Sequence, residues 1–192
     1  MAAIGFFGGS FNPIHNGHVS LARQLCAMAG LDEVWLMVSP QNPLKQDHDL
    51  LADELRMQMV RLALRRETRV KPSDYELHLP KPSYTWNTLQ SLSRDFPDDR
   101  FTLLIGGDNW QLFPRWHRAS DIMQNYDICV YPRRGSEIDA ASLPARVRLV
   151  EAELLDISST DIRRRLADGQ PIAGLVPSSV ARFITKNHLY QK

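Results

Sequence analysis

"GGSFNPIHNGH", residues 8–18, follows the apolar run "AIGFF" at 3–7 and contains three glycines, one proline and two histidines. A tight turn needs about one glycine, and an apolar core has no use for His15 and His18 three residues apart. This composition predicts a turn between a strand and a helix whose backbone lies against a ligand.

Strand-like runs alternate with helical patterns on both sides of this turn. The runs lie at 3–7, 34–38, 101–105 and 126–131. Alternation of this kind is typical of a parallel sheet covered by helices. We therefore predict an α/β fold of the Rossmann-like class, a doubly wound and mostly parallel sheet with helices on both faces.

Helical spacing supports the same architecture. Val19, Ala22, Cys26 and Ala29 mark one face of a helix after the first strand, and Gly30 is expected to end it. Further helices are predicted over 51–62, from near Thr85 to before Pro97, and at the C-terminus in 177–190. The segment 39–49, "SPQNPLKQDHD", has two prolines and no apolar period, and we expect a long loop there.

Composition limits the class of protein. The chain has 192 residues and is 43% hydrophobic, with 23 Lys plus Arg against 22 Asp plus Glu. We expect a single domain over 1–192 and no nucleic-acid partner, because no broad basic face is present. Without a membrane-length apolar stretch or a secretory leader, no membrane partner and a cytoplasmic location are predicted. Cys26 and Cys129 are expected to be buried thiols with no disulfide between them.

The first turn falls where doubly wound sheets bind ligands, at the carboxyl end of a strand. It contains neither the G-x-G-x-x-G nor the G-K-[ST] pattern. With a helix beginning at Asn16 or Gly17, the first-turn amides, His15 and His18 converge on one anion. Two alternatives are a zinc site and a solvated helix cap. No clustered third ligand accompanies the pair in the sequence, so we predict no protein-held metal.

Two motifs together carry a family resemblance. "GGSFNPIHNGH" resembles the H-x-G-H signature of nucleotidylyltransferases, and "ISSTDIRRRL" at 157–166 is similar to their second signature, I-S-S-T-x-I-R. With "NPLK", "SYTWNTL", "IGGDNW", "RWHR" and "GLVPSSVARFITKNHLY", nearly the whole chain resembles the bacterial nicotinate-nucleotide adenylyltransferase family. Asn12 stands where many members have Asp, and Leu44 where a His is common. The first departure puts one metal or ribose contact in doubt.

The resemblance implies a reaction and a set of residues. ATP and nicotinate mononucleotide would give deamido-NAD and pyrophosphate by in-line attack without a covalent intermediate, with Mg²⁺ bound through the ATP phosphates. The catalytic residues implied are His15, His18 and Arg163. The ATP-binding residues implied are Gly8, Gly9, Ser10, Phe11, His15, His18, Lys45, Gly106, Ser158, Ser159, Thr160 and Arg163. The residues implied for the mononucleotide are Tyr84, Thr85, Asp108, Trp116 and Arg134.

Alternatives stay open at this stage. Asp108 is equally explained as part of a turn or helix cap, and Lys45 and Arg134 as solvated charges. A pantetheine-phosphate adenylyltransferase or a cytidylyltransferase shares H-x-G-H. A non-catalytic nucleotide sensor is the more distant reading, because fold alone does not determine function. The oligomeric state is also open, and a homo-oligomer is compatible with the sequence.

Overall fold

The computed structural model describes residues 1–40 and 50–191. Its strands form one six-stranded sheet, all parallel, in the order β3-β2-β1-β4-β5-β6. The strands are β1 (Ala3–Gly9), β2 (Glu33–Val38), β3 (Val70–Ser73), β4 (Arg100–Gly106), β5 (Asp127–Tyr131) and β6 (Val147–Leu149). The four predicted strands are confirmed as β1, β2, β4 and β5. The sequence analysis missed β3 and β6, which have four and three residues and lie at the two edges.

Seven α-helices connect and flank these strands in the described residues. They are α1 (Asn16–Met28), α2 (Asp53–Leu64), α3 (Thr85–Asp95), α4 (Gly107–Leu112), α5 (Ala119–Asn125), α6 (Ser159–Ala167) and α7 (Ser178–Lys186). Short 3-10 turns occur at Tyr75–His78, Phe113–Arg115 and Ala140–Ser142. None of the helices found in the described part of the chain is long and apolar enough to cross a bilayer.

The helices divide between the two faces of the sheet. One apolar core contains buried side chains of α1, α2, α6 and α7, and the second contains those of α3 and α5. The prediction of helices on both faces is therefore confirmed. Cys26 and Cys129 are buried free thiols in the first core, as expected.

Helix α2 differs from its prediction. It begins at Asp53 instead of residue 51. The apolar spacing in 51–62 predicts a stripe of Leu51, Leu55, Met59 and Leu62, of which Met59 is buried and the leucines are half-buried against the first core. The buried positions of the helix are Arg56, Met57, Met59, Val60 and Leu64. The predicted stripe therefore faces the core, but its most buried part includes an arginine, which an apolar pattern cannot reveal.

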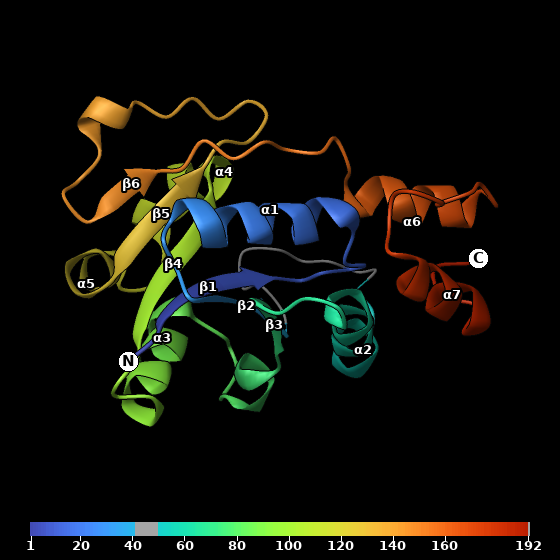
Figure 1. Ribbon diagram of the computed structural model, residues 1–192, viewed down its shortest axis with the longest axis horizontal. Helices are drawn as coiled ribbons and strands as arrows, with labels where there is room; N and C mark the ends of the chain where they lie inside the picture. The colour runs from blue at the N-terminus through green and yellow to red at the C-terminus, as the bar shows by residue number, and fades with distance from the viewer. Residues whose placement is uncertain (41–49, 192) are drawn as a thin grey trace.

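The topology places two sequence motifs at one edge. Strands β1 and β4 are the neighbours from which the connections wind outward in opposite directions, and ligands bind at the carboxyl ends of such a pair. Figure 1 shows the beginning of α1 and the beginning of α6 close to this end of β1, with α7 beyond them. Segments more than 140 residues apart in the chain thereby meet, since Ser159 bonds to Pro13 across a separation of 146 residues.

Candidate active site

The turn after β1 is built by close backbone packing. A Cβ atom at Gly9 would lie 2.9 Å from the ring of Phe11, so only glycine fits there without a shift. Phe11 itself has φ +45°, a left-handed conformation that is uncommon for a bulky residue. Its buried ring packs edge-on against His18, with centroids 5.1 Å apart. The Phe11 side chain thus supports a histidine, and only its backbone is available to a ligand.

The two histidines begin α1 and cap each other. The backbone N–H of His18 donates to Nδ1 of His15, and the backbone N–H of His15 donates to Nδ1 of His18, each at 3.3 Å. Because both Nδ1 atoms are acceptors, each neutral ring carries its proton on Nε2. The rings are stacked with centroids 3.6 Å apart. The pair therefore carries two Nε2–H donors on adjacent stacked rings.

Electrostatics keep this pair neutral. Burial, and then the charge of Arg133, lowers the pKa of His15 to about 4. The pKa of His18 is held well below its usual range, first by burial, then by His15, and then by Arg133. Near pH 7 the two rings are thus uncharged donors beside a permanent cation. A bound polyanion would oppose all of these effects and favour the protonated rings.

The second motif contacts the first directly. Ser158 caps α6 by accepting the backbone N–H of Asp161 at 3.1 Å, as the sequence predicts for this pair of serines. Ser159 Oγ donates to the carbonyl of Pro13 at 2.9 Å. Arg163 donates to the carbonyl of Asn12, also at 2.9 Å. The amino end of α6, a binding position for anions, is thereby fixed to the glycine-rich turn.

Asn12 holds the turn from inside. Its side chain is buried, and its Oδ1 accepts the Tyr190 hydroxyl at 2.7 Å and the backbone N–H of Leu51 at 3.4 Å. Fully buried Arg56 adds a second internal support, because it donates to the carbonyls of Ser10, Ser39, Pro40 and Leu51. Neither role was found in the sequence. Buried polar residues inside otherwise apolar elements carry no periodic signal.

A cavity of about 140 Å³ opens beside the turn, between the carboxyl ends of β1 and β4 and the start of α3. Its lining includes Gly8, Gly9 and Ser10 of the turn, together with Thr85 and Trp116 from the middle of the chain. The structure thus brings these predicted residues to one cavity. The sequence analysis missed other lining residues, namely Ser39, Glu76, Asn109 and Tyr131.

Three further predicted residues lie around this cavity without lining it. Tyr84 precedes α3 and packs its ring on His117, with centroids 4.6 Å apart. Gly106 ends β4 and precedes α4. Asp108 lies in the first turn of α4, which agrees with the alternative of a helix terminus, and its carboxylate is 3.7 Å from Nε of Arg133.

The two cations predicted from loops have different positions. Arg134 is exposed and pairs with Asp156 at 3.1 Å, whereas the neighbouring Arg133 affects both histidines. The sequence "YPRRG" contains two adjacent arginines, Arg133 and Arg134. Which of them lies near the histidines depends on the direction of the backbone after β5. Lys45 lies outside the described residues, as does Leu44.

No group of three His, Cys, Asp or Glu side chains suited to a metal ion occurs within residues 1–40 and 50–191. The groups that do converge are neutral N–H donors, helix amides and arginines. This donor set suits phosphate oxygens better than a bare cation.

The sequence is similar to a known family of enzymes along most of its length. Residues 6–165 match the Cytidylyltransferase-like family. A Bacteroides fragilis protein named probable nicotinate-nucleotide adenylyltransferase is 49% identical over 94% of this chain and 90% of its own length. A Flavobacterium johnsoniae protein of the same name is 40% identical over 98% and 99% of the two chains.

The chain belongs to the nicotinate-nucleotide adenylyltransferase family. Members of this family are nucleotidyltransferases, so the expected enzyme class is confirmed. The fold also agrees with solved structures. Plasmodium falciparum nicotinic acid mononucleotide adenylyltransferase, complexed with NaAD, superposes with a TM-score of 0.83 at 20% identity, over 99% of this chain and 98% of that one.

Proposed function

We propose that this chain transfers the adenylyl group of ATP to nicotinate mononucleotide, forming deamido-NAD and pyrophosphate for NAD synthesis, at the cavity between β1 and β4. The observation that carries the proposal is the contact of the two motifs, through the Arg163 bond to Asn12 and the Ser159 bond to Pro13. The family relatives named nicotinate-nucleotide adenylyltransferase support the choice of substrate.

The attacking group needs no strong base. The phosphate of the mononucleotide has a second pKa of about 6, so it is mostly a dianion at neutral pH. The enzyme has to align two anions that repel each other and to stabilise the charge that grows on the α-phosphate. Neutral Nε2–H donors of His15 and His18 suit this task, because their rings are fixed by the mutual caps.

The β- and γ-phosphates are assigned to the amino end of α6. Amides near Ser159 and Thr160 are available there, and Arg163 adds a planar cation that contacts phosphate through two donors. The backbone amides of Gly8, Gly9 and Ser10 complete the phosphate side. Mg²⁺ would be bound by the ATP phosphate oxygens and water, where it offsets charge, with few ligands from the chain.

The pyridine ring is assigned to the cavity beneath Trp116. Helix α3 begins at Thr85, its preceding residue Tyr84 provides no side-chain cap, and Thr85 lines the cavity. Free amides at a helix start favour a negative substituent on the ring. Glu76 also lines this cavity, and its Oε1 accepts the Thr88 hydroxyl at 2.8 Å, which fixes that carboxyl to α3. We assign Asp108 and Arg133, whose side chains are 3.7 Å apart at the carboxyl ends of β4 and β5, to a ribose or phosphate group.

The test compares the two pyridine mononucleotides side by side. We expect pyrophosphate release from MgATP with nicotinate mononucleotide and a lower kcat/KM with the amide. Charge-assisted bonds contribute about 1.5–3 kcal/mol and a helix end about 0.3–2 kcal/mol, so a combined preference on the order of 2–4 kcal/mol lowers kcat/KM roughly 30- to 1000-fold. A ratio below about tenfold would contradict the role of the α3 amides.

The same assay separates the alternatives. Turnover only with phosphopantetheine or with CTP would identify another nucleotidylyltransferase. Binding of ATP without pyrophosphate release, whichever second substrate is added, would identify a non-catalytic nucleotide sensor.

A further inference from the structure

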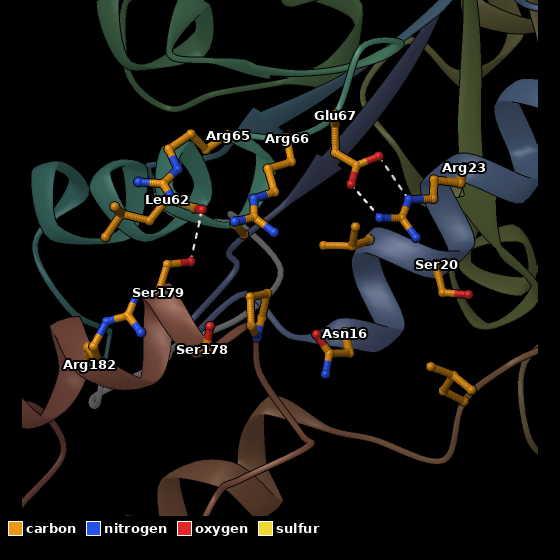
Figure 2. Close-up of a pocket in the computed structure, with 14 residues that line it drawn as sticks. Asn16, Ser20, Arg23, Leu62, Arg65, Arg66, Glu67, Ser178, Ser179 and Arg182 are labelled. Carbon is orange, nitrogen blue, oxygen red and sulfur yellow. Dashed lines mark hydrogen bonds and ion pairs between the residues drawn. The ribbon is translucent and has the colours of Figure 1, made fainter.

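A second and larger hollow lies on the outside of the first core, between α1, the end of α2 and the start of α7. Its volume is about 620 Å³, within the usual range for small-molecule sites. It shares no lining residue with the cavity beneath Trp116. Figure 2 shows side chains from all three helices around it.

Positive charge is concentrated around this hollow. Four arginines line it, from three elements, against a single carboxylate: Arg23, Arg65, Arg66, Arg182 and Glu67. Glu67 is paired with Arg23, because both of its carboxylate oxygens accept hydrogen bonds from the Arg23 guanidinium (Figure 2). The other three arginines make no hydrogen bond or ion pair with any residue in 1–40 or 50–191. These three arginines are exposed to solvent and line one hollow, where their combined charge favours an anion.

Helix α7 adds donors at the same place. Pro177 precedes its first turn and provides no side-chain cap. The Ser179 hydroxyl donates to the carbonyl of Leu62 at 3.0 Å, so this side chain binds α2 instead of capping its own helix (Figure 2). The amides of Val180 and Ala181 are bonded to the Pro177 carbonyl. The preceding amides, of Ser178 and Ser179, have no capping side chain and belong to residues that line the hollow.

The remaining wall is apolar, which distinguishes the hollow from a simple cationic patch. Five apolar residues line it beside the arginines: Val19, Leu62, Ala63, Leu155 and Pro177. A triphosphate alone would leave this apolar wall exposed to water, whereas the base or ribose of a nucleotide would cover it. Arginine also stacks on aromatic planes.

We propose that this hollow is a second nucleotide site, which takes a nucleoside di- or triphosphate with its phosphates on Arg65, Arg66, Arg182 and the start of α7. The wall from Val19 to Leu155 would contact the base. Asn16 connects this site to the catalytic turn, because it lines the hollow, follows His15, and donates to the carbonyls of Leu175 and Gly174 at 2.9 and 2.8 Å. The proposal goes beyond the adenylyl transfer described above.

Equilibrium dialysis with radiolabelled ATP and Mg²⁺, without mononucleotide, measures how many nucleotides one chain binds. We expect two per chain in the wild type and one in the variant R65A/R66A/R182A. A matched control, R94A/R100A/R146A, removes three exposed arginines near the amino ends of β4 and β5 and should still bind two. A second variant, Ser178→Glu, places a carboxylate where a helix start tolerates it and should also bind one.

The proposal requires R65A/R66A/R182A and Ser178→Glu each to bind one ATP fewer per chain than the wild type, and equal binding by the wild type and both variants would overturn it. Thermal unfolding of each variant shows that the fold is kept. Pyrophosphate release with nicotinate mononucleotide is read separately. If the catalytic site binds no ATP, the expected count becomes one in the wild type and none in the two variants, so the difference between them still tests this hollow alone.

Discussion

The phosphate side and the pyridine side of the candidate site differ in how their polar groups are satisfied. On the phosphate side, both histidine Nδ1 atoms, the Asn12 Oδ1 and the Ser159 hydroxyl all have partners within the chain. On the pyridine side, Trp116 Nε1 and Glu76 Oε2 are buried without a hydrogen-bond partner among the described residues, although both residues line the cavity.

This difference indicates two modes of recognition. Donors that are fixed before the substrate arrives cost no reorganisation when charge develops, which suits catalysis at the α-phosphate. Buried polar atoms without partners cost roughly 1–3 kcal/mol each, and pairing recovers this free energy. An acceptor on the ligand, such as a carboxylate oxygen, can pair with Trp116 Nε1, whereas Glu76 Oε2 accepts only and needs a donor such as water. The pyridine side therefore suits substrate selection, so its variants should change KM, while variants of the histidine pair on the phosphate side should change kcat.

The largest expected effect comes from His18→Ala. Loss of one fixed donor to the α-phosphate should lower kcat by roughly 10²- to 10³-fold. His18→Asn is the matched control, because its short side chain can still accept the His15 amide but cannot reach the phosphate as Nε2 does. Both variants should lose rate to a similar extent, measured by pyrophosphate release at saturating substrates. Normal turnover in either folded variant would remove His18 from catalysis.

The next effect is a pH dependence of stability that arises from His15. Its pKa is about 4 in the folded chain and 6.5 when unperturbed, so between these values the unfolded chain binds more protons. The contribution of neutral His15 to the free energy of unfolding is fully present above pH 6.5. As the pH drops from there to 4, the free energy of unfolding falls by about 3 kcal/mol.

Urea unfolding at pH 7 and pH 4 measures this loss. His15→Asn keeps a good helix cap but does not titrate, so its loss should be smaller by that amount. Equal losses in the two proteins would mean that His15 titrates normally, and the phosphate side would then lack its neutral donors.

Arg163→Ala should weaken ATP and pyrophosphate binding together, by roughly 10- to 150-fold, since a charge-assisted bond contributes about 1.5–3 kcal/mol. The bond from Arg163 to Asn12 is lost as well. Arg163→Lys keeps the charge without the fork of donors and should recover only part of the affinity. Calorimetric titration with each ligand measures both. Unchanged affinity in the Ala variant would limit Arg163 to holding the turn.

The contrast between the two sides also explains what the sequence could predict. Gly8, Gly9, His15, His18 and Arg163 stand in contiguous motifs whose local geometry follows from a strand, a turn and a helix start. The pyridine side is assembled from single residues of separate elements, such as Glu76 and Trp116. Such partners meet only through tertiary packing, which a linear pattern does not contain. Arg133 was missed for the same reason, because the choice between it and Arg134 depends on where the chain turns after β5.

The smallest effect should separate the ring of Trp116 from its N–H group. Trp116→Ala removes the stacking surface, and aromatic pairing contributes about 0.5–1.5 kcal/mol, so KM for the mononucleotide should rise roughly 2- to 10-fold while KM for ATP changes little. The N–H group has no partner to lose among residues 1–40 and 50–191. Trp116→Phe keeps an apolar ring and should therefore show a higher KM than wild type only if Nε1 donates to the substrate. Steady-state KM for both substrates in the two variants measures each part. If Phe behaves as wild type and Ala raises KM, the ring alone selects the substrate. Equal changes in KM for ATP and mononucleotide would show that Trp116 supports the second core through Phe113 instead, and the difference between the two sides would then not be one of substrate contact.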